Sequence, residues 1–271
     1  MSETDLSDEY SCLKNSKNPE TAGEEFDEKV GKIYEDLKKS SIEKQEDVAY
    51  SDGEMTKVDI WGPEDSEKLF VMIHGGYWLI GNRKKCLSVV DVARKLGYTV
   101  VSVGYDYANK DHPLSKTIEE TLLGVRFALK KFSCAKKVVI GGHSVGAHLA
   151  FQAATRISDS RICGIFLSAG IYKLQELVHT TYGKDLGLTV EEAEAASCDY
   201  DLLRTVRFPI LIANCKIESP KLYEQNVEFS RHVPNAQYKE YGNEDHFTIL
   251  TELSNENSPL YADLYNFLFS L

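Results

Sequence analysis

The stretch VVIGGHSVGAHLA, residues 138–150, decides the fold. It begins as an apolar run typical of a strand, passes through a glycine-rich turn and continues as an alanine-rich helical pattern. The turn reads Gly142-His143-Ser144-Val145-Gly146. Its glycines allow the backbone to fold tightly and to expose the serine hydroxyl at the strand end. The pattern predicts Ser144 as a nucleophile, and a glycine-rich turn with an incidental serine is the alternative.

Around this stretch, short apolar runs alternate with helical patterns. Strands are predicted at 69–73, 99–103, 137–141, 162–167, 209–214 and 237–241. Helices are predicted at 24–39, 82–96, 114–132, 144–157, 220–232 and 258–271. Two further strands, joined by a turn at Asp52-Gly53, precede the first apolar run. This alternation predicts an α/β fold, with a mostly parallel sheet covered by helices on both faces.

The predicted domain organisation is simple. Residues 1–22 are polar and acidic, and we expect a flexible tail there. Residues 23–271 are predicted to form a single domain, because no repeat or linker interrupts them. The segment 173–204 is long, acidic and helix-prone and lies between two predicted strands, so we expect a small helical cap over a site at the strand ends.

The composition restricts the partners. The 271 residues include 42 acidic and 31 basic side chains, a net charge of −11, which argues against binding to nucleic acid or to an anionic membrane surface. The N-terminus lacks the pattern of a secretory signal, and no apolar run could span a bilayer, so we expect a cytoplasmic protein. The six cysteines are scattered, which favours free thiols. No cofactor and no metal site is predicted.

A second glycine motif, HGGYW at residues 74–78, directly follows the apolar run 69–73. Glycines at such a strand end let backbone N–H groups point into a site. A donor from Gly75 or Gly76, together with the N–H of Val145, would hold the oxyanion of a tetrahedral intermediate. A plain tight turn is the alternative, but two such motifs in one chain support each other.

The general base is predicted from residue order. Hydrolases with this type of serine turn carry the nucleophile, the acid and the histidine in that order, with the histidine after the last strand. His246, in GNEDHF after the run 237–241, has this place. We therefore predict that His246 accepts the proton of Ser144 and later protonates the leaving group.

The same order requires a carboxylate between the serine and the histidine, at a strand end. Glu218 follows the buried run 209–214 and precedes a helix that Ser219 can cap, with Pro220 in its first turn. Most other acids in this interval lie on predicted helices, within a strand or beside the histidine, and Glu218 alone follows a buried strand and precedes a helix. Glu218 is therefore predicted to orient His246, and an ordinary solvated loop acid is the alternative.

Taken together, HGGYW, GHSVG, IESP and EDHF resemble the kynurenine formamidase (arylformamidase) family, from about Tyr10 to the C-terminus. The resemblance implies an α/β-hydrolase fold. The family carries D-S-P-E-F where this chain has Glu218-Ser219-Pro220-Lys221-Leu222, so its acid is one methylene longer here.

The resemblance also implies a reaction, the hydrolysis of N-formyl-L-kynurenine to formate and L-kynurenine in tryptophan breakdown. Ser144 would carry a formyl-enzyme intermediate. The small-molecule substrate has an aromatic amino-acid side that needs a pocket, for which Tyr77, Trp78 and Tyr172 are candidate walls, and core aromatics are the alternative. Homodimers occur in the family, so a homodimer is an option for this chain.

Two other functions are compatible with these motifs. A general carboxylesterase or lipase-like hydrolase of small acyl esters would use the same machinery. A non-catalytic binding protein of this fold usually lacks a member of the triad, and the sequence offers candidates for all three members. A metal-dependent amidase is a weaker alternative, because His143 and His148 do not form a recognised ligand pair.

Overall fold

The computed structural model describes residues 3–206, 208–233 and 236–271. Within these residues, one sheet has the strand order β1-β2-β4-β3-β5-β6-β7-β8. The strands are β1 (Lys44–Ala49), β2 (Lys57–Trp61), β3 (Lys68–Ile73), β4 (Tyr98–Val103), β5 (Lys137–His143), β6 (Ile162–Ser168), β7 (Ile210–Ile217) and β8 (Ala236–Asp245). β1 and β2 are antiparallel, whereas β3 to β8 pair in parallel. The predicted α/β-hydrolase architecture is confirmed.

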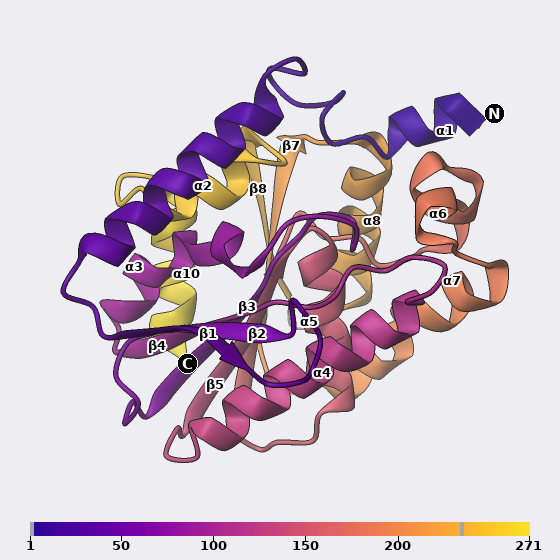
Figure 1. Cartoon of the computed structure of the whole chain (residues 1–271). Coiled ribbons are helices and arrows are strands. Elements are labelled where there is room, and N and C mark those ends of the chain that lie inside the picture. Colours follow the sequence, from indigo (N-terminus) through magenta and orange to yellow (C-terminus); the bar gives the residue numbers. More distant parts are fainter. Residues whose placement is uncertain (1–2, 207, 234–235) are drawn as a thin grey trace.

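Helices cover both faces of the sheet (Figure 1). The longer ones are α2 (Ala22–Lys39), α4 (Leu114–Lys131), α5 (Val145–Arg156), α8 (Pro220–His232) and α10 (Pro259–Ser270). α4, α5 and α8 bury apolar side chains against one face, and α10 and the short α3 (Val90–Arg94) do so against the other. Because the central strands are buried on both faces, their sequences read as continuous apolar runs, as β3 shows.

The strand register determines which residues meet at the edge of the sheet. His143 at the end of β5 pairs with Ser168 of β6. Ile217 of β7 pairs with Asp245 of β8, so the two residues that follow, Glu218 and His246, leave the sheet side by side. Because the strands are parallel, all these ends lie at one edge, where sites of open α/β sheets form.

Between β6 and β7 lies the segment that is predicted as a cap. It contains η2 (Gln175–His179), α6 (Thr181–Leu186), α7 (Val190–Ala196) and η3 (Tyr200–Thr205). Thr180 and Thr189 begin α6 and α7 by accepting hydrogen bonds from the backbone N–H groups of Gly183 and Glu192. α6 ends at Gly187 in the left-handed conformation. The helical character of the segment follows from these local signals.

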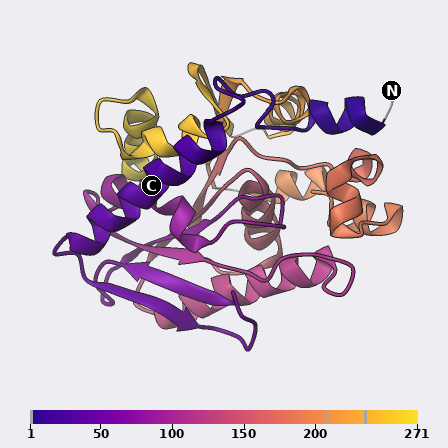
Figure 2. The same cartoon turned by 45° about the horizontal axis from the view of Figure 1, so that its top comes forward.

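The N-terminal segment differs from the prediction. Met1 and Ser2 lie outside the described residues. Residues 3–9 form α1 (Glu3–Glu9), which contacts η2 and α6 (Figures 1 and 2). The side chain of Tyr10 is completely buried. We call residues 6–22 the N-terminal strap. The prediction of a flexible tail is wrong for this segment, because a few buried side chains outweigh its polar average composition.

Smaller differences concern the segment 82–96 and β8. The predicted helix at 82–96 is a 3₁₀ segment, η1 (Arg83–Val89), followed by α3, with a kink at Cys86. β8 extends to Asp245, so His246 follows the strand directly and not after a loop. None of the described helices has the length and apolar character that crossing a membrane requires.

Candidate active site

Ser144 occupies the sharp turn between β5 and α5. Its backbone has φ 59° and ψ −126°, a region that non-glycine residues rarely adopt. A Cβ at Gly142 would lie 2.0 Å from the carbonyl oxygen of Gly146, and one at Gly146 would lie 2.2 Å from that of Ile73. Both glycines are therefore required by close backbone approach, as the tight serine turn predicts.

The serine is held tightly and is covered. Its backbone N–H donates to the carbonyl oxygen of Ser168 at 2.8 Å. Only 2% of the residue is exposed, whereas the sequence predicts an exposed hydroxyl. Gly75 lies against it, because a Cβ there would be 3.0 Å from the Cβ of Ser144. Among the described residues, the Ser144 hydroxyl makes no hydrogen bond.

The HGGYW loop places its backbone beside Ser144. Gly76 has φ +113°, and Tyr77 and Trp78 have φ of 52° and 59°. Three consecutive left-handed residues turn the loop sharply after β3, a strain typical of functional sites. Val145 is the first residue of α5, where a backbone N–H has no partner within the helix. The positions fit the predicted donors Gly75, Gly76 and Val145, whose role stays a prediction.

The predicted acid and base form a buried pair. Glu218 Oε2 lies 2.6 Å from Nδ1 of His246, and 0% of the Glu218 side chain and 6% of the His246 side chain are exposed. The other carboxylate oxygen, Oε1, accepts the N–H of Ser219 at 2.7 Å. Ser219 precedes α8 as expected, but its hydroxyl makes no capping hydrogen bond. Glu218 is therefore not a solvated loop acid.

The surroundings of His246 affect its protonation. Burial disfavours the imidazolium, but the neighbouring Cys12 and Glu218 outweigh this effect and raise the pKa of His246 well above its usual value. Since Nδ1 faces the carboxylate, the imidazole donates from Nδ1, and Nε2 is the nitrogen that Glu218 does not engage.

His143 supports His246, a role that the sequence analysis did not identify. Nε2 of His143 lies 2.8 Å from the carbonyl oxygen of His246, and the two ring centroids are 4.7 Å apart. Burial lowers the pKa of His143 to about 3, so the ring is neutral and donates from Nε2–H to the carbonyl oxygen. The only signal in the sequence was a histidine directly before the nucleophile.

Cys12 is the second residue that the sequence analysis missed. Its thiol, one nitrogen of His246 and one carboxylate oxygen of Glu218 all lie within 4.8 Å of one another. All three residues are buried. Burial raises the pKa of the Cys12 thiol above its ordinary value, while the neighbouring His246 acts in the opposite direction. No local pattern could connect Cys12 to a histidine so far away in the chain.

The three aromatic residues that are predicted to line a substrate pocket differ in position. Trp78 and Tyr172 are both 0% exposed and belong to the core. Trp78 meets the ring of His148 edge-on, and Tyr172 stacks on Phe229 with ring centroids 3.9 Å apart. Both rings therefore pack in the core, which is the alternative left open by the sequence, and their contact with substrate stays a prediction. Tyr77 is partly buried and stacks on Tyr182 of α6, in the segment between β6 and β7 that we call the insertion. Its contact with substrate stays a prediction.

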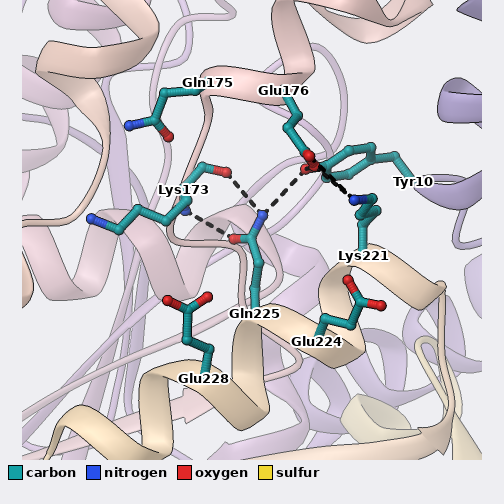
Figure 3. Close-up of a pocket in the computed structure, with 8 residues that line it drawn as sticks. All are labelled: Tyr10, Lys173, Gln175, Glu176, Lys221, Glu224, Gln225 and Glu228. Atoms are coloured by element: carbon teal, nitrogen blue, oxygen red, sulfur yellow. Dashed lines mark hydrogen bonds and ion pairs between the residues drawn. The ribbon is translucent and has the colours of Figure 1, made fainter. Parts of the chain in front are cut away.

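A polar pocket of about 210 Å³ lies beside the strap (Figure 3). Its lining residues are Tyr10, Lys173, Gln175, Glu176, Lys221, Glu224, Gln225 and Glu228. Gln225 donates to the Lys173 carbonyl oxygen at 2.9 Å and to the Tyr10 hydroxyl at 3.3 Å, and it thereby joins α8 to the strap. None of the predicted catalytic residues lines this pocket.

Two groups of side chains in the described residues have donor atoms close enough to hold a metal ion. One is the buried group of Cys12, Glu218 and His246. The other consists of Asp106, His112 and Glu120, where Nε2 of His112 lies 3.4 Å from Oε2 of Glu120. The sequence predicted neither group.

Residues 70–210 match the family described as alpha/beta hydrolase fold. The chain belongs to this family of hydrolases. It is 29% identical over 238 residues to a kynurenine formamidase of Danio rerio, with 78% of this chain and 77% of that protein covered. It is 25% identical over 269 residues to a kynurenine formamidase of Drosophila melanogaster, with 90% and 84% covered. The predicted resemblance to kynurenine formamidases is confirmed, and the comparisons support an amide hydrolase.

Solved structures agree on the fold. A putative thioesterase from Silicibacter sp. TM1040 superposes with a TM-score of 0.80 at 19% identity, covering 95% of this chain and 97% of that chain. A bacterial heroin esterase superposes with a TM-score of 0.65 at 14% identity, with coverages of 91% and 88%. At such low identities, these similarities concern the fold alone.

Proposed function

We propose that this enzyme hydrolyses the formyl amide of N-formyl-L-kynurenine to formate and L-kynurenine, through a formyl-enzyme on Ser144. The observation that carries the catalytic part is the 2.6 Å contact between Glu218 and His246 beside the serine turn. The similarity to curated kynurenine formamidases supports the substrate. The proposal includes a cytoplasmic location and a small-molecule substrate.

In the first half of the reaction, the Ser144 hydroxyl attacks the formyl carbon. Nε2 of His246 accepts the serine proton, while Glu218 holds Nδ1–H and stabilises the imidazolium. The N–H of Val145 and a glycine N–H of the HGGYW loop stabilise the oxyanion, where negative charge develops in the transition state. The imidazolium then protonates the aryl amine, which leaves as L-kynurenine.

In the second half, His246 removes a proton from water, which attacks the formyl ester of Ser144. The same donors hold the second oxyanion, and formate leaves as the serine regains its proton. A formyl carbon carries only a hydrogen atom, so its side of the site needs almost no room. The close approach of Gly75 to Ser144 is compatible with such a small acyl group.

The test is a comparison of N-formyl-L-kynurenine with formyl, acetyl and butyryl esters of one alcohol, measured as kcat/KM. The proposal expects the formyl amide to be preferred over the butyryl ester. Much faster hydrolysis of the butyryl ester would instead establish a general carboxylesterase.

Ser144→Ala tests the nucleophile in the same assay. We expect a loss of about 10⁶-fold in kcat, and mass spectrometry of quenched wild-type enzyme should detect a formyl adduct on the peptide that contains Ser144. Ser88→Ala is the matched control, since Ser88 is a buried serine outside this site whose hydroxyl makes no hydrogen bond with the described residues. Unchanged turnover in Ser144→Ala would refute the assignment.

A further inference from the structure

The N-terminal strap closes over the end of the sheet that carries His246. The Lys17 N–H donates to Oδ2 of Asp245 at 3.0 Å, directly before the histidine. The Tyr10 hydroxyl donates to Glu176 of the insertion at 3.1 Å, and the Tyr10 carbonyl oxygen accepts the hydroxyl of Tyr77. These contacts hold the strap between the HGGYW loop, the insertion and the histidine.

Between these contacts, the strap places the thiol of Cys12 at the catalytic pair. The fractions of Cys12, Glu218 and His246 that are exposed are only 6%, 8% and 4%. Apart from its hydrogen bond with His246, the thiol has weak partners, since its Sγ lies 3.9 Å from the Tyr10 carbonyl oxygen and 4.0 Å from the Tyr77 hydroxyl. It is therefore available as a ligand, and the proposed hydrolysis does not use it.

The arrangement around His246 is one that metal sites use. A histidine that binds a metal through one ring nitrogen generally donates its other N–H to a carboxylate, a backbone carbonyl or water, which fixes the ring. Glu218 already accepts Nδ1–H of His246 in this way. Nε2 is left as the nitrogen that could face a metal, and the sulfur of Cys12 lies within 4.8 Å of one nitrogen of this ring. Sulfur and imidazole are the preferred ligands of zinc and related soft cations.

We propose that a soft divalent cation such as Zn²⁺ binds between Cys12 and Nε2 of His246 and inhibits the hydrolase. Water completes the coordination, and Glu218 orients the ring. The thiol loses its proton to solvent as the sulfur–metal bond forms. The metal occupies the nitrogen lone pair that would accept the serine proton, and it ties the strap to the histidine. This inference rests on the proposed role of His246 as general base.

The first test is inhibition of N-formyl-L-kynurenine hydrolysis by Zn²⁺, expressed for each variant relative to its own metal-free rate. The wild type should be inhibited and should recover on addition of a chelator. Cys12→Ser should weaken the inhibition by about tenfold or more. Cys215→Ser is the matched control, because Cys215 is also buried, with its Sγ 3.3 Å from Oε2 of Glu218. Its Zn²⁺ inhibition should match the wild type.

A second test measures binding without turnover. Co²⁺ added to Ser144→Ala should produce the thiolate-to-cobalt absorption band, and Ser144→Ala combined with Cys12→Ala should lack it. Equal Zn²⁺ inhibition of wild type and Cys12→Ser, or a band that persists without Cys12, would overturn the metal site. A band that depends on Cys12 in an enzyme without formamidase activity would refute the proposed substrate and leave the metal site standing, so the two failures are distinguishable.

Discussion

Oε2 of Glu218 and Nδ1 of His246 lie 2.6 Å apart in the protein interior, although 28 positions separate the two residues in the chain. The pair forms because Ile217 and Asp245, the residues before them, are partners in neighbouring parallel strands. This contact supports the proposed role of Glu218 in orienting His246, and substitution of the carboxylate tests that role.

Glu218→Gln should lower kcat by about 10³–10⁴-fold, because an amide neither fixes the histidine tautomer nor stabilises the imidazolium. Glu224→Gln is the control, since Glu224 lies on α8 and lines the polar pocket beside the strap. It should keep most of the activity in the same steady-state assay. The reverse pattern would assign the acid to Glu224.

The pH dependence of kcat/KM should follow the protonation of His246. The imidazole must be neutral to accept the serine proton, and Cys12 and Glu218 raise its pKa despite burial. Activity should therefore rise with pH through an apparent pKa above the ordinary value of about 6.5. Glu218→Gln removes a negative charge, so its residual activity should begin to rise at lower pH. The profiles are recorded with a chelator present, and an acid limb at or below the ordinary value would contradict this assignment.

Gly142→Ala should destabilise the protein and inactivate it. The added Cβ would lie 2.0 Å from a backbone oxygen in the serine turn, so the turn must shift. We expect a loss of about 2 kcal/mol or more in the free energy of unfolding, measured by denaturant titration. Gly31→Ala is the control, because Gly31 is exposed in α2 with open space around it. That change should stabilise the helix by roughly 0.5–1 kcal/mol.

Tyr10→Ala should loosen the N-terminal strap. Tyr10 is completely buried, and removal of a buried aromatic ring costs about 3–5 kcal/mol. We expect faster hydrogen exchange in residues 6–17 and little change in β3 and β5, because chain ends open locally. Leu13→Ala, at a position that is 47% exposed, should leave this exchange unchanged. Equal protection in Tyr10→Ala would show that other contacts hold the strap.

The sequence predicted most of the fold. The elements at 114–132, 144–157 and 220–232 lie within one residue of α4, α5 and α8, because strong apolar periodicity and end signals determine them locally. The prediction of one continuous helix at 82–96 was wrong, because a kink at Cys86 interrupts the segment, which forms η1 and then α3. Trp78 and Tyr172 were expected at a pocket wall, since composition alone does not distinguish a buried ring from a rim ring.

The sequence by itself determined the features that depend on neighbouring residues or on the order of motifs along the chain. The glycines around Ser144 and the position of His246 after the last strand belong to this group. Only the tertiary structure decided that Glu218 reaches His246, that His143 supports the same residue and that the strap brings Cys12 to it. These contacts depend on strand register and on packing between distant segments, which local propensity and hydrophobic pattern do not encode.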